Sequence, residues 1–344
     1  MIRRLFIAIA FLLPITTTAK DKKISILPVP AFGYAPETGT YIGAVSLFTF
    51  NFYNDSLTRT SNAKLELNYT WRNQIIVETE WNYFFKNEGW FTKGRLHFSK
   101  FPDRYYGIGA NTIETDEYLY NSNRTIVDAH ILKNTGNRLF AGIGIKHIGF
   151  RNVTPLNETK YPELKDNKST GAGISLLKDT RDNLLTPSKG IYISLYSGYV
   201  FTKQQYAELT FDSRYYLTHR KVTFAVRWYN DLNFNNAPFY DLALMGGDKY
   251  IRGFYYGRYR DNHLSTLQAE VRSVFLWRFG LAAFGGLSNV YSSFDRFAVN
   301  NVKYNAGAGI RFLIDRKENI NLRLDYAVGS GNNSGFYISF GEAF

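Results

Sequence analysis

The chain has 344 residues, a formal net charge of +12 and no cysteine. Its length suits one large domain or two smaller ones. The absence of cysteine excludes disulfide frameworks, thiolate catalysis and cysteine-bound zinc. The lysines and arginines are scattered along the chain and form no basic tract, so nucleic acid is not an expected partner.

The N-terminus has the three parts of a secretory signal peptide. Arg3 and Arg4 are followed by an apolar run over residues 5–15 and by the small residues Thr17-Thr18-Ala19. We predict a signal peptide over residues 1–19, cut after Ala19. The alternative, a helical membrane anchor, needs about 20 apolar residues. Residues 20–38 carry three prolines, and we predict that they form a short periplasmic segment before a barrel domain over residues 39–344.

The rest of the chain alternates apolar and polar residues with the two-residue period of β-strands. In "AKLELNYTW" (63–71) and "INLRLDYAV" (320–328), apolar side chains share one face and polar ones the other. The predicted strands cover 39–53, 61–72, 74–86, 89–100, 104–114, 123–133, 137–150, 168–178, 189–202, 204–218, 220–232, 264–276, 279–291, 302–314, 319–330 and 335–344. Residues 72–73 and 218–221 are expected to be tight turns, and 150–168 and 232–263 long loops.

Three features favour a membrane barrel over a soluble sheet. The predicted strands are long compared with the usual 5–6 residues or so, charges recur on one face, and aromatic residues gather at strand ends. In a bilayer every backbone group must be paired, so the sheet must close. We therefore predict an all-β fold, a transmembrane antiparallel β-barrel of about 16 strands in the bacterial outer membrane.

Inward-facing positions carry glycine pairs and charges of both signs. The glycine pairs are Gly107/Gly109, Gly142/Gly144, Gly171/Gly173 and Gly307/Gly309. Glycine within a strand often marks the close approach of another backbone, so we interpret these pairs as an inward wall that makes room for a loop in the lumen. For the charges, two readings stay open: a structural network of paired groups, or a selectivity ring for a solute.

No catalytic or metal-binding pattern is present. The five histidines lack metal-ligand spacing, and no G-x-S-x-G motif occurs. The sequence therefore predicts no enzyme, no cofactor and no metal.

The long loop before residue 264 contains "GGDKYIRGF", residues 246–254. Its motif residues are Gly246, Gly247, Ile251, Arg252, Gly253 and Phe254. Further along, the C-terminus places Phe336, Ile338, Phe340 and Phe344 in "GFYISFGEAF". Alternating apolar residues that end in an aromatic resemble the signal that outer-membrane proteins present to the host barrel-insertion machinery during biogenesis.

The "GGDKYIRGF" stretch resembles the loop motif of the BamA/TamA-like outer-membrane assembly-factor superfamily, also called bacterial surface antigen proteins. The stretches 30–43, 179–190 and 269–286 are also similar to that family. The resemblance implies that the loop between strands 11 and 12 folds into the lumen, where its arginine pairs with acids on the inner wall. The family's aspartate on strand 13 is absent at Phe284-Gly285-Gly286-Leu287-Ser288, so Glu270 is the expected partner of Arg252.

The resemblance also implies a function. Relatives usually carry POTRA domains before the barrel, whereas here only residues 20–38 precede the first predicted strand, which indicates a barrel-only member. The expected activity is insertion or translocation of proteins or lipids at the outer membrane. It would use a weak seam between 39–53 and 335–344. The expected partners are the lipid bilayer and an unfolded outer-membrane protein or lipid client. Two alternatives stay open: a pore for small solutes, or a membrane anchor or homo-oligomeric scaffold.

Overall fold

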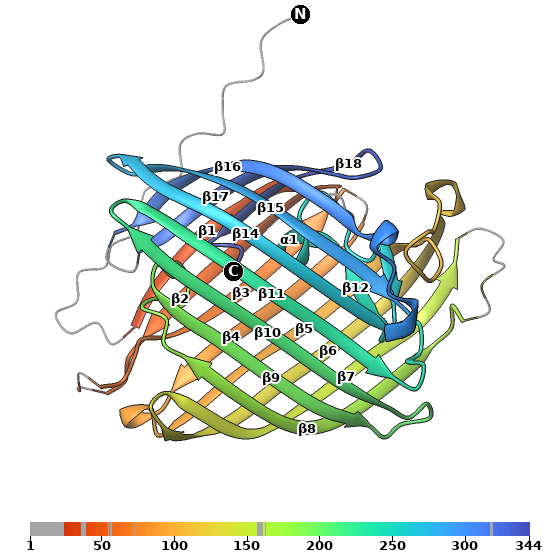
Figure 1. Cartoon of the computed structure of the whole chain (residues 1–344), viewed down its shortest axis with the longest axis horizontal. Coiled ribbons are helices and arrows are strands. Elements are labelled where there is room, and N and C mark those ends of the chain that lie inside the picture. Colours follow the sequence, from red (N-terminus) through yellow and green to blue (C-terminus); the bar gives the residue numbers. More distant parts are fainter. Residues whose placement is uncertain are drawn as a thin grey trace, which may run out of the picture.

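Long antiparallel strands run side by side and wrap into a barrel in the computed structural model (Figure 1). The structure describes residues 24–35, 39–53, 55, 57–71, 73–156, 161, 163–316 and 319–344. The predicted signal peptide lies outside these residues. None of the helical segments in the described parts of the chain is long and apolar enough to cross a membrane.

The strands and helices have the following bounds. They are β1 (Ile24–Ala35), β2 (Gly39–Phe50), β3 (Ser61–Thr70), β4 (Ile75–Phe84), η1 (Lys86–Glu88), β5 (Trp90–Tyr105), η2 (Glu114–Asp116), β6 (Tyr118–Gly136), β7 (Leu139–Pro155), β8 (Asn167–Asp179), β9 (Gly190–Val200), β10 (Tyr206–His219), β11 (Val222–Phe234), β12 (Ala243–Met245), α1 (Gly247–Tyr250), β13 (Tyr259–Asp261), β14 (His263–Leu276), β15 (Phe279–Tyr291), η3 (Phe294–Arg296), η4 (Val299–Asn301), β16 (Lys303–Asp315), β17 (Ile320–Gly329) and β18 (Asn333–Phe340).

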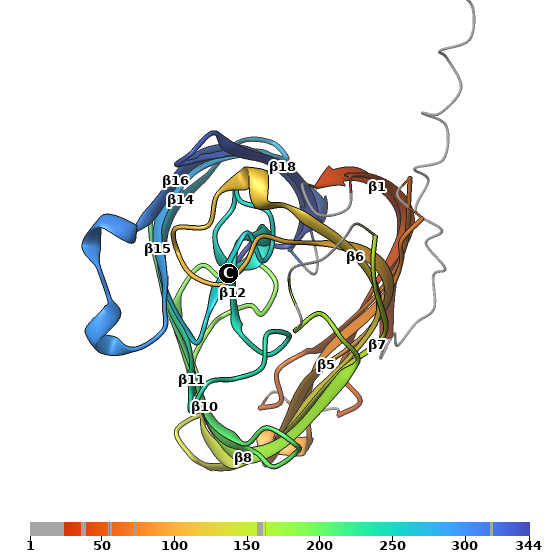
Figure 2. The ribbon, with the colours of Figure 1, turned by 90° about the vertical axis from the view of Figure 1, so that its right-hand side faces the viewer.

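Within the described residues, sixteen strands form one sheet, in the order β1 to β11 followed by β14 to β18. Each strand pairs with the next in antiparallel register, from β1–β2 through to β17–β18. The short strands β12 and β13 pair only with each other. Viewed down the barrel, they lie inside the ring of strands (Figure 2). The predicted all-β barrel fold is thus confirmed.

The predicted strand count is right, but one strand was missed and one predicted strand is wrong. Residues 24–35 are the first strand, β1, and not a lead-in to the sheet. Residues 106–117 form a loop with the short helix η2, so the strand predicted over 104–114 does not exist; residues 104 and 105 are the end of β5. Instead β5 continues through Pro102, which pairs with Asn121 of β6. Pro28, Pro30 and Pro102 concealed the strand character of their neighbours, because proline lacks the N–H of a regular ladder.

The missed strand and the false strand leave the total at sixteen. The strands between them, β2 to β5, were however numbered one too low, so each was assigned the opposite direction across the membrane. Because β3 and β11 are both odd-numbered in an antiparallel sheet, they run the same way. The tight turn 71–74 therefore lies at the same end of the barrel as the long loop 235–262. The turn 220–221 lies at the opposite end of the barrel, where β1 begins and β18 ends.

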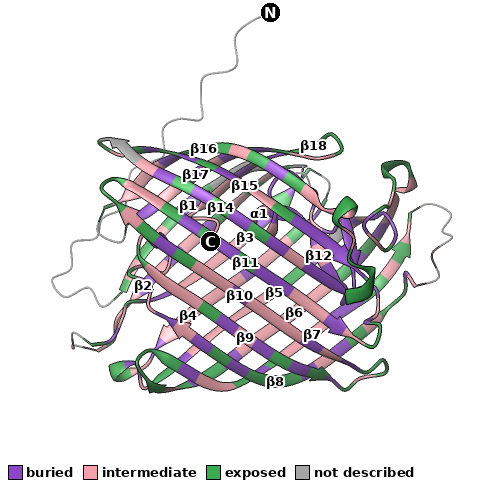
Figure 3. Cartoon of the chain, in the orientation of Figure 1, coloured by how far each residue is buried: buried purple, intermediate pink, exposed green. Residues whose placement is uncertain are grey.

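Buried and exposed residues alternate along the strands of the barrel (Figure 3). The buried ones include many charged side chains, and the exposed ones include many large apolar side chains. Ile143 and Ile174, which are paired across β7 and β8, are 61% and 64% exposed. By contrast, Glu208, Arg227, Arg323 and other charged side chains are buried in the lumen. A soluble sandwich would have the reverse pattern, whereas an apolar outer band and a polar interior are typical of outer-membrane barrels.

Candidate functional site: a lumen loop held by a buried charge cluster

The loop between β11 and β14 enters the lumen and folds there as a compact unit. The β12–β13 hairpin forms its stem, and α1 leads to its tip at Arg252. Ile251 and Phe254 have no exposed surface, and Arg252 is 1% exposed. The motif residues 246–254 are therefore inside the protein, as the family resemblance implied.

Two glycines of the motif allow the tight path of the loop. Gly246 has a φ of +112° and Gly253 a φ of +97°, in the region that glycine adopts without steric cost. A Cβ atom on Gly246 would lie 2.1 Å from the carbonyl oxygen of Tyr255. One on Gly253 would lie 3.2 Å from the backbone nitrogen of Gly329 in β17. The glycines thus bring the loop backbone close to itself and to the wall.

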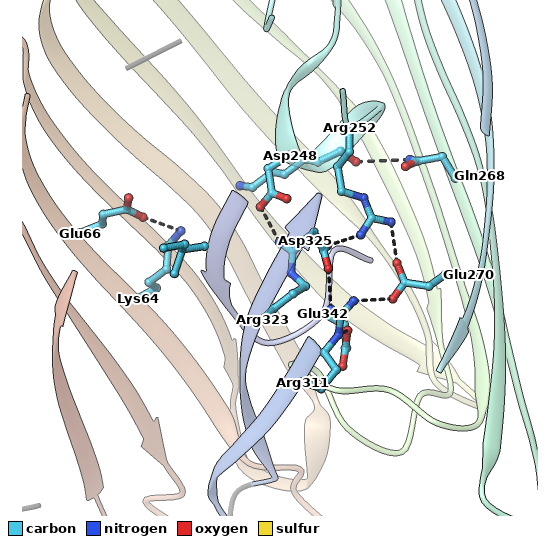
Figure 4. A network of polar contacts seen from close by, with 12 residues as sticks. Lys64, Glu66, Asp248, Arg252, Gln268, Glu270, Arg311, Arg323, Asp325 and Glu342 are labelled. Atoms are coloured by element: carbon cyan, nitrogen blue, oxygen red, sulfur yellow. Dashed lines mark hydrogen bonds and ion pairs between the residues drawn. The ribbon is translucent and has the colours of Figure 1, made fainter. Parts of the chain in front are cut away.

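Arg252 connects the loop tip to two distant strands (Figure 4). Its Nη2 donates to Oε2 of Glu270 on β14 at 2.5 Å, and its Nη1 donates to the carboxylate of Asp325 on β17. Its guanidinium carbon lies 3.3 Å from the ring centroid of Phe284 on β15. A planar fork with aromatic stacking is a geometry that arginine provides and lysine does not.

Around Arg252 lies a cluster that we call the Arg252 cluster. It comprises Arg252, Arg272, Arg311, Arg323, Asp248, Glu270, Asp325 and Glu342. Four arginines and four carboxylates give a formal charge of zero. Burial of ions is tolerated when each charge is paired and hydrogen-bonded, and this balance meets that condition.

The two central carboxylates each accept from three arginines. Glu270 accepts from Arg252, from Arg272 Nε at 2.8 Å and from Arg311 Nη2 at 3.0 Å. Asp325 accepts from Arg252, from Arg311 Nη1 at 2.6 Å and from Arg323 Nη1 at 2.8 Å. Arg252 therefore adds to ion pairs that side chains of the barrel strands already form with one another.

Asp248 of α1 adds a second ion pair from the loop, with Arg323 Nη2 at 2.5 Å. Burial alone would raise the pKa of Asp248, but the charge of Arg323 outweighs it and holds the pKa below its usual range. The loop thus presents one cation and one anion to the wall.

Further hydrogen bonds fix the loop on several sides of the lumen. On the side of the last strands, Asn305 Nδ2 donates to the carbonyl oxygen of Arg252 at 2.7 Å, and Gly253 N–H donates to Tyr337 Oη of β18 at 2.8 Å. On the opposite side, Tyr255 Oη donates to Asp103 of β5 at 2.6 Å. The loop therefore spans the barrel interior.

The Arg252–Glu270 contact was expected from the resemblance, whereas Asp325, Asn305 and Tyr337 were not recognised as loop contacts. Alternation placed Asp325 on the inner face, but nothing in the local sequence indicates which distant loop such a side chain meets. Asp325 supplies the second carboxylate for Arg252, which residues 284–288 of β15 do not provide.

The proposed glycine wall is only partly realised. Gly107 and Gly109 lie in the loop after β5, with positive φ, and not in a strand; Gly109 N–H donates to Arg260 of the lumen loop. Gly142, Gly144, Gly171 and Gly173 do lie in strands. The atoms nearest to a Cβ built on them belong to neighbouring strands and not to the loop.

The fourth glycine pair, on β16, lies beside the Arg252 cluster. A Cβ on Gly307 would meet the ring of Phe284 at 2.4 Å, and one on Gly309 would lie 1.8 Å from Asp325 Oδ1. Gly329 of β17, which the sequence did not single out, is the glycine beside the loop itself, because its Cβ would lie 2.6 Å from the Phe254 ring.

The predicted C-terminal signal does not form one outward face. β18 ends at Phe340, and Gly341, with a φ of +75°, turns the chain inward. Phe344 is 3% exposed and packs against Tyr216 and Ala225 inside the barrel. Phe336 stays 37% exposed, and Ile338 is half-buried. The outward alternation therefore stops before the last four residues.

Between the lumen loop and the C-terminal tail lies a cavity of about 410 Å³. Its wall includes Asp248 to Tyr250 of the loop, Leu184 and Leu185 of the turn after β8, and Phe344. The loop therefore leaves an open chamber in the lumen, at the end of the barrel where β1 begins and β18 ends.

Comparison with known proteins identifies the family. The Omp85 superfamily domain matches residues 46–344. The crystal structure of BamA from Haemophilus ducreyi lacking POTRA domains 1–3 is similar, with a TM-score of 0.57 and 14% identity, over 94% of this chain and 70% of that one. CdiB from Acinetobacter baumannii is similar with a TM-score of 0.61 and 11% identity, over 92% of this chain and 60% of that one.

At these identities the two structures show a shared fold. The sequence matches none of the curated proteins. The domain match covers most of the chain and agrees with the sixteen-stranded sheet and the lumen loop. The chain therefore belongs to the Omp85 superfamily, as a β-barrel of the bacterial outer membrane.

Proposed function

We propose that this barrel helps to insert or translocate proteins or lipids at the outer membrane, by opening between β1 and β18. The observation that carries the proposal is the seam between these strands. Among the described residues, β1 and β18 lie side by side but share no hydrogen-bonded ladder, whereas all the other neighbours in the barrel do. An unpaired edge is a template on which another strand can pair.

The sequence of β1 supports a weak seam. Pro28 and Pro30 lack backbone N–H groups and, two residues apart, direct those vacant positions to the same side of the strand. The β1–β2 register is unbroken from Ile24 to Ala35, so we infer that the vacant positions face β18. Proline is tolerated on such an edge, and there it removes donors that would close the barrel.

The lumen loop is attached to the strands of this seam. Tyr337 of β18 accepts from the loop tip, and Asp325 of the adjacent β17 pairs with Arg252. In this proposal Arg252 pins the loop, and the pinned loop holds the last strands in place. Residues 1–19 would direct export, host machinery would insert the barrel, and the chain would act without enzymatic chemistry.

The proposal can be tested by locking the seam. Leu27 of β1 and Phe340 of β18 pack against one cluster of Val45, Leu47 and Ile320. The chain has no cysteine, so Leu27→Cys with Phe340→Cys introduces the only thiols. In liposomes, the reduced variant should speed folding of an unfolded small barrel protein relative to protein-free liposomes. Oxidation should abolish the acceleration, and reduction should restore it.

A matched control places the disulfide within a paired ladder. Thr218 and Thr223 lie opposite each other on β10 and β11, with their hydroxyl oxygens 2.9 Å apart. The Thr218→Cys, Thr223→Cys variant should accelerate folding equally in both redox states. If the locked seam variant remains active, the seam is not the route and the proposal fails.

The chamber in the lumen favours a second candidate, a pore for small solutes. In that case the loop would act as a constriction. Conductance across planar bilayers that persists with the seam locked, combined with no acceleration of folding, would support the pore.

A further inference from the structure

A second group of charges in the lumen lies apart from the Arg252 cluster. It surrounds Tyr192 of β9, on the wall of the chamber. The guanidinium carbons of Arg181 and Arg214 lie 4.4 Å and 4.8 Å from the Tyr192 ring centroid, and Lys93 Nζ lies 5.6 Å from it. We call Lys93, Arg181, Tyr192 and Arg214 the Tyr192 site.

Positive charge exceeds negative charge at this site. Among the described residues, Asp212 is the only carboxylate that pairs with Arg214 and Arg227, at 2.6 Å and 2.9 Å. Asp179 pairs with Arg181 and Arg59, and Arg59 also pairs with Glu88. Together with Lys93, these are five cations and three carboxylates, an excess of two positive charges.

Lys93 has no acidic partner among the described residues. Its Nζ donates to Tyr192 Oη at 3.1 Å and to Ser194 Oγ at 2.9 Å. Arg181 and Arg214 each use Nε and Nη2 for their aspartates, which leaves Nη1 of each without a hydrogen bond within the described part of the chain. Three N–H donor groups are therefore available around one ring.

Three acids elsewhere on the chamber wall do not supply the missing negative charge, because each pairs with a cation of its own: Glu80 with Lys249, Asp248 with Arg323, and Glu342 with Arg311. A fourth, Asp128, lies beside His130, which is charged only when protonated, and opposite Lys146 of β7. Unlike the Arg252 cluster, which is neutral, the Tyr192 site is cationic, and it opens into about 410 Å³ of space.

We propose that the Tyr192 site binds a phosphate group, either free in solution or at the head of a phosphomonoester lipid. A phosphate monoester carries a charge of about −1.5 to −2 at neutral pH, which matches the excess of two. Arginine N–H groups and a lysine ammonium are the usual protein ligands of phosphate oxygens. This site is independent of the seam and goes beyond the proposed function.

Calorimetric titration of the purified barrel, in phosphate-free detergent, tests the site with inorganic phosphate. Wild-type protein should bind one equivalent saturably. The Lys93→Gln, Arg214→Gln variant should bind at least tenfold more weakly, because it removes both uncompensated charges. Asp212 keeps Arg227 in this variant, and folding is verified by heat-modifiable migration on gels.

The matched control removes the same charge from an exposed turn outside the chamber. Arg220 and Lys221 connect β10 and β11 and are exposed, so Arg220→Gln with Lys221→Gln should bind phosphate as wild type does. If the double chamber variant does not fold, Lys93→Gln alone serves, since an amide can keep the bonds to Tyr192 and Ser194. The proposal is overturned if wild type does not bind, or if chamber and turn variants bind equally.

The source of the phosphate is decided in a second titration, with short-chain phosphatidic acid below its micellar concentration. Binding of the lipid at least tenfold tighter than inorganic phosphate, and lost in the chamber variant, assigns the site to a lipid headgroup. Equal binding assigns it to free phosphate. Failure of the seam test leaves both titrations unaffected.

Discussion

At the residue scale, Arg252 matters because one rigid group meets two strands at once. Its two terminal nitrogens reach Glu270 on β14 and Asp325 on β17. The strands are not neighbours, since β15 and β16 lie between them. A single guanidinium therefore fixes the loop tip across four strands of the wall.

Substitution of Arg252 and Glu270 should have unequal effects on stability. Removing one partner of a buried ion pair costs about 3–5 kcal/mol. Arg252→Ala leaves both carboxylates with two arginines each, so we expect a loss near the low end of this range. Glu270→Gln removes the acid that three arginines share, so its loss should be larger. Urea unfolding in phospholipid vesicles measures both.

The double variant separates the direct contact from the rest of the network. Because the two residues share one ion pair, the loss in Arg252→Ala, Glu270→Gln should be smaller than the sum of the single losses. Additive losses, or equal single losses, would contradict the network described here. Arg252→Lys should behave almost as Arg252→Ala, because an ammonium does not reach both acids with fork geometry.

At the element scale, β16 must lack a side chain at position 309, beside the Arg252 cluster. A Cβ at position 309 would overlap Asp325, so Gly309→Ala should push this carboxylate away from Arg252. Overpacking typically costs about 1–3 kcal/mol. Gly285→Ala on β15 is the control, because its Cβ would meet only Asn305 O, at 3.2 Å. Comparable losses in both variants would show that any added methyl group is harmful, and would contradict the role of Gly309.

The lumen loop should also respond to pH through Asp241, which precedes β12. Burial raises the pKa of Asp241 to about 6, against the opposing effect of hydroxyls from Ser169 and Tyr206 and of Lys146. A folded-state pKa above the ordinary value of 3.8 adds stability at low pH. That stability is lost as pH rises through about 6.

Asp241→Asn tests this dependence. Hydrogen exchange of loop 235–262 in wild type should be faster at about pH 7.5 than at about pH 5, after correction for the intrinsic rates. The variant should lose part of the difference, because burial also raises the pKa of Asp261 in the same loop. Asp295→Asn, in the exposed helix η3, should retain it. A wild-type loop whose corrected exchange is the same at both pH values would refute the prediction.

The sequence predicted elements better than contacts between them. Alternation located β2 to β4, β6 to β11 and β14 to β18 to within a few residues, because each pattern is local. The strands that contain Pro28, Pro30 or Pro102 were missed or shortened, since their composition is that of turns. Asp325 was identified as inward, but its contact with Arg252, 73 residues away, depends on how the whole sheet curves.

At the scale of the whole molecule, the apolar exterior defines where the bilayer lies. On the outer face of β7, alternate positions run through Leu139, Ala141, Ile143 and Ile145 and then become polar at His147. The side chain opposite Ile143 is Ile174, and the one opposite His147 is Thr170, whose hydroxyl lies 2.8 Å from His147 Nδ1. The apolar band therefore centres near Ile143 and ends before His147.

Arginine substitutions at Ile143 and His147 test where the apolar band lies in the bilayer. In a bilayer, arginine at the midplane of a barrel's outer face costs about 2–4 kcal/mol and near the interface about 0–1 kcal/mol. We therefore expect Ile143→Arg to lower the free energy of unfolding in phospholipid vesicles by the larger amount, and His147→Arg by the smaller. In detergent micelles, which adapt their thickness around a charge, the two variants should differ much less. Equal losses in vesicles would mean that the band is centred elsewhere, and the assignment of Ile143 to the membrane midplane would have to be abandoned.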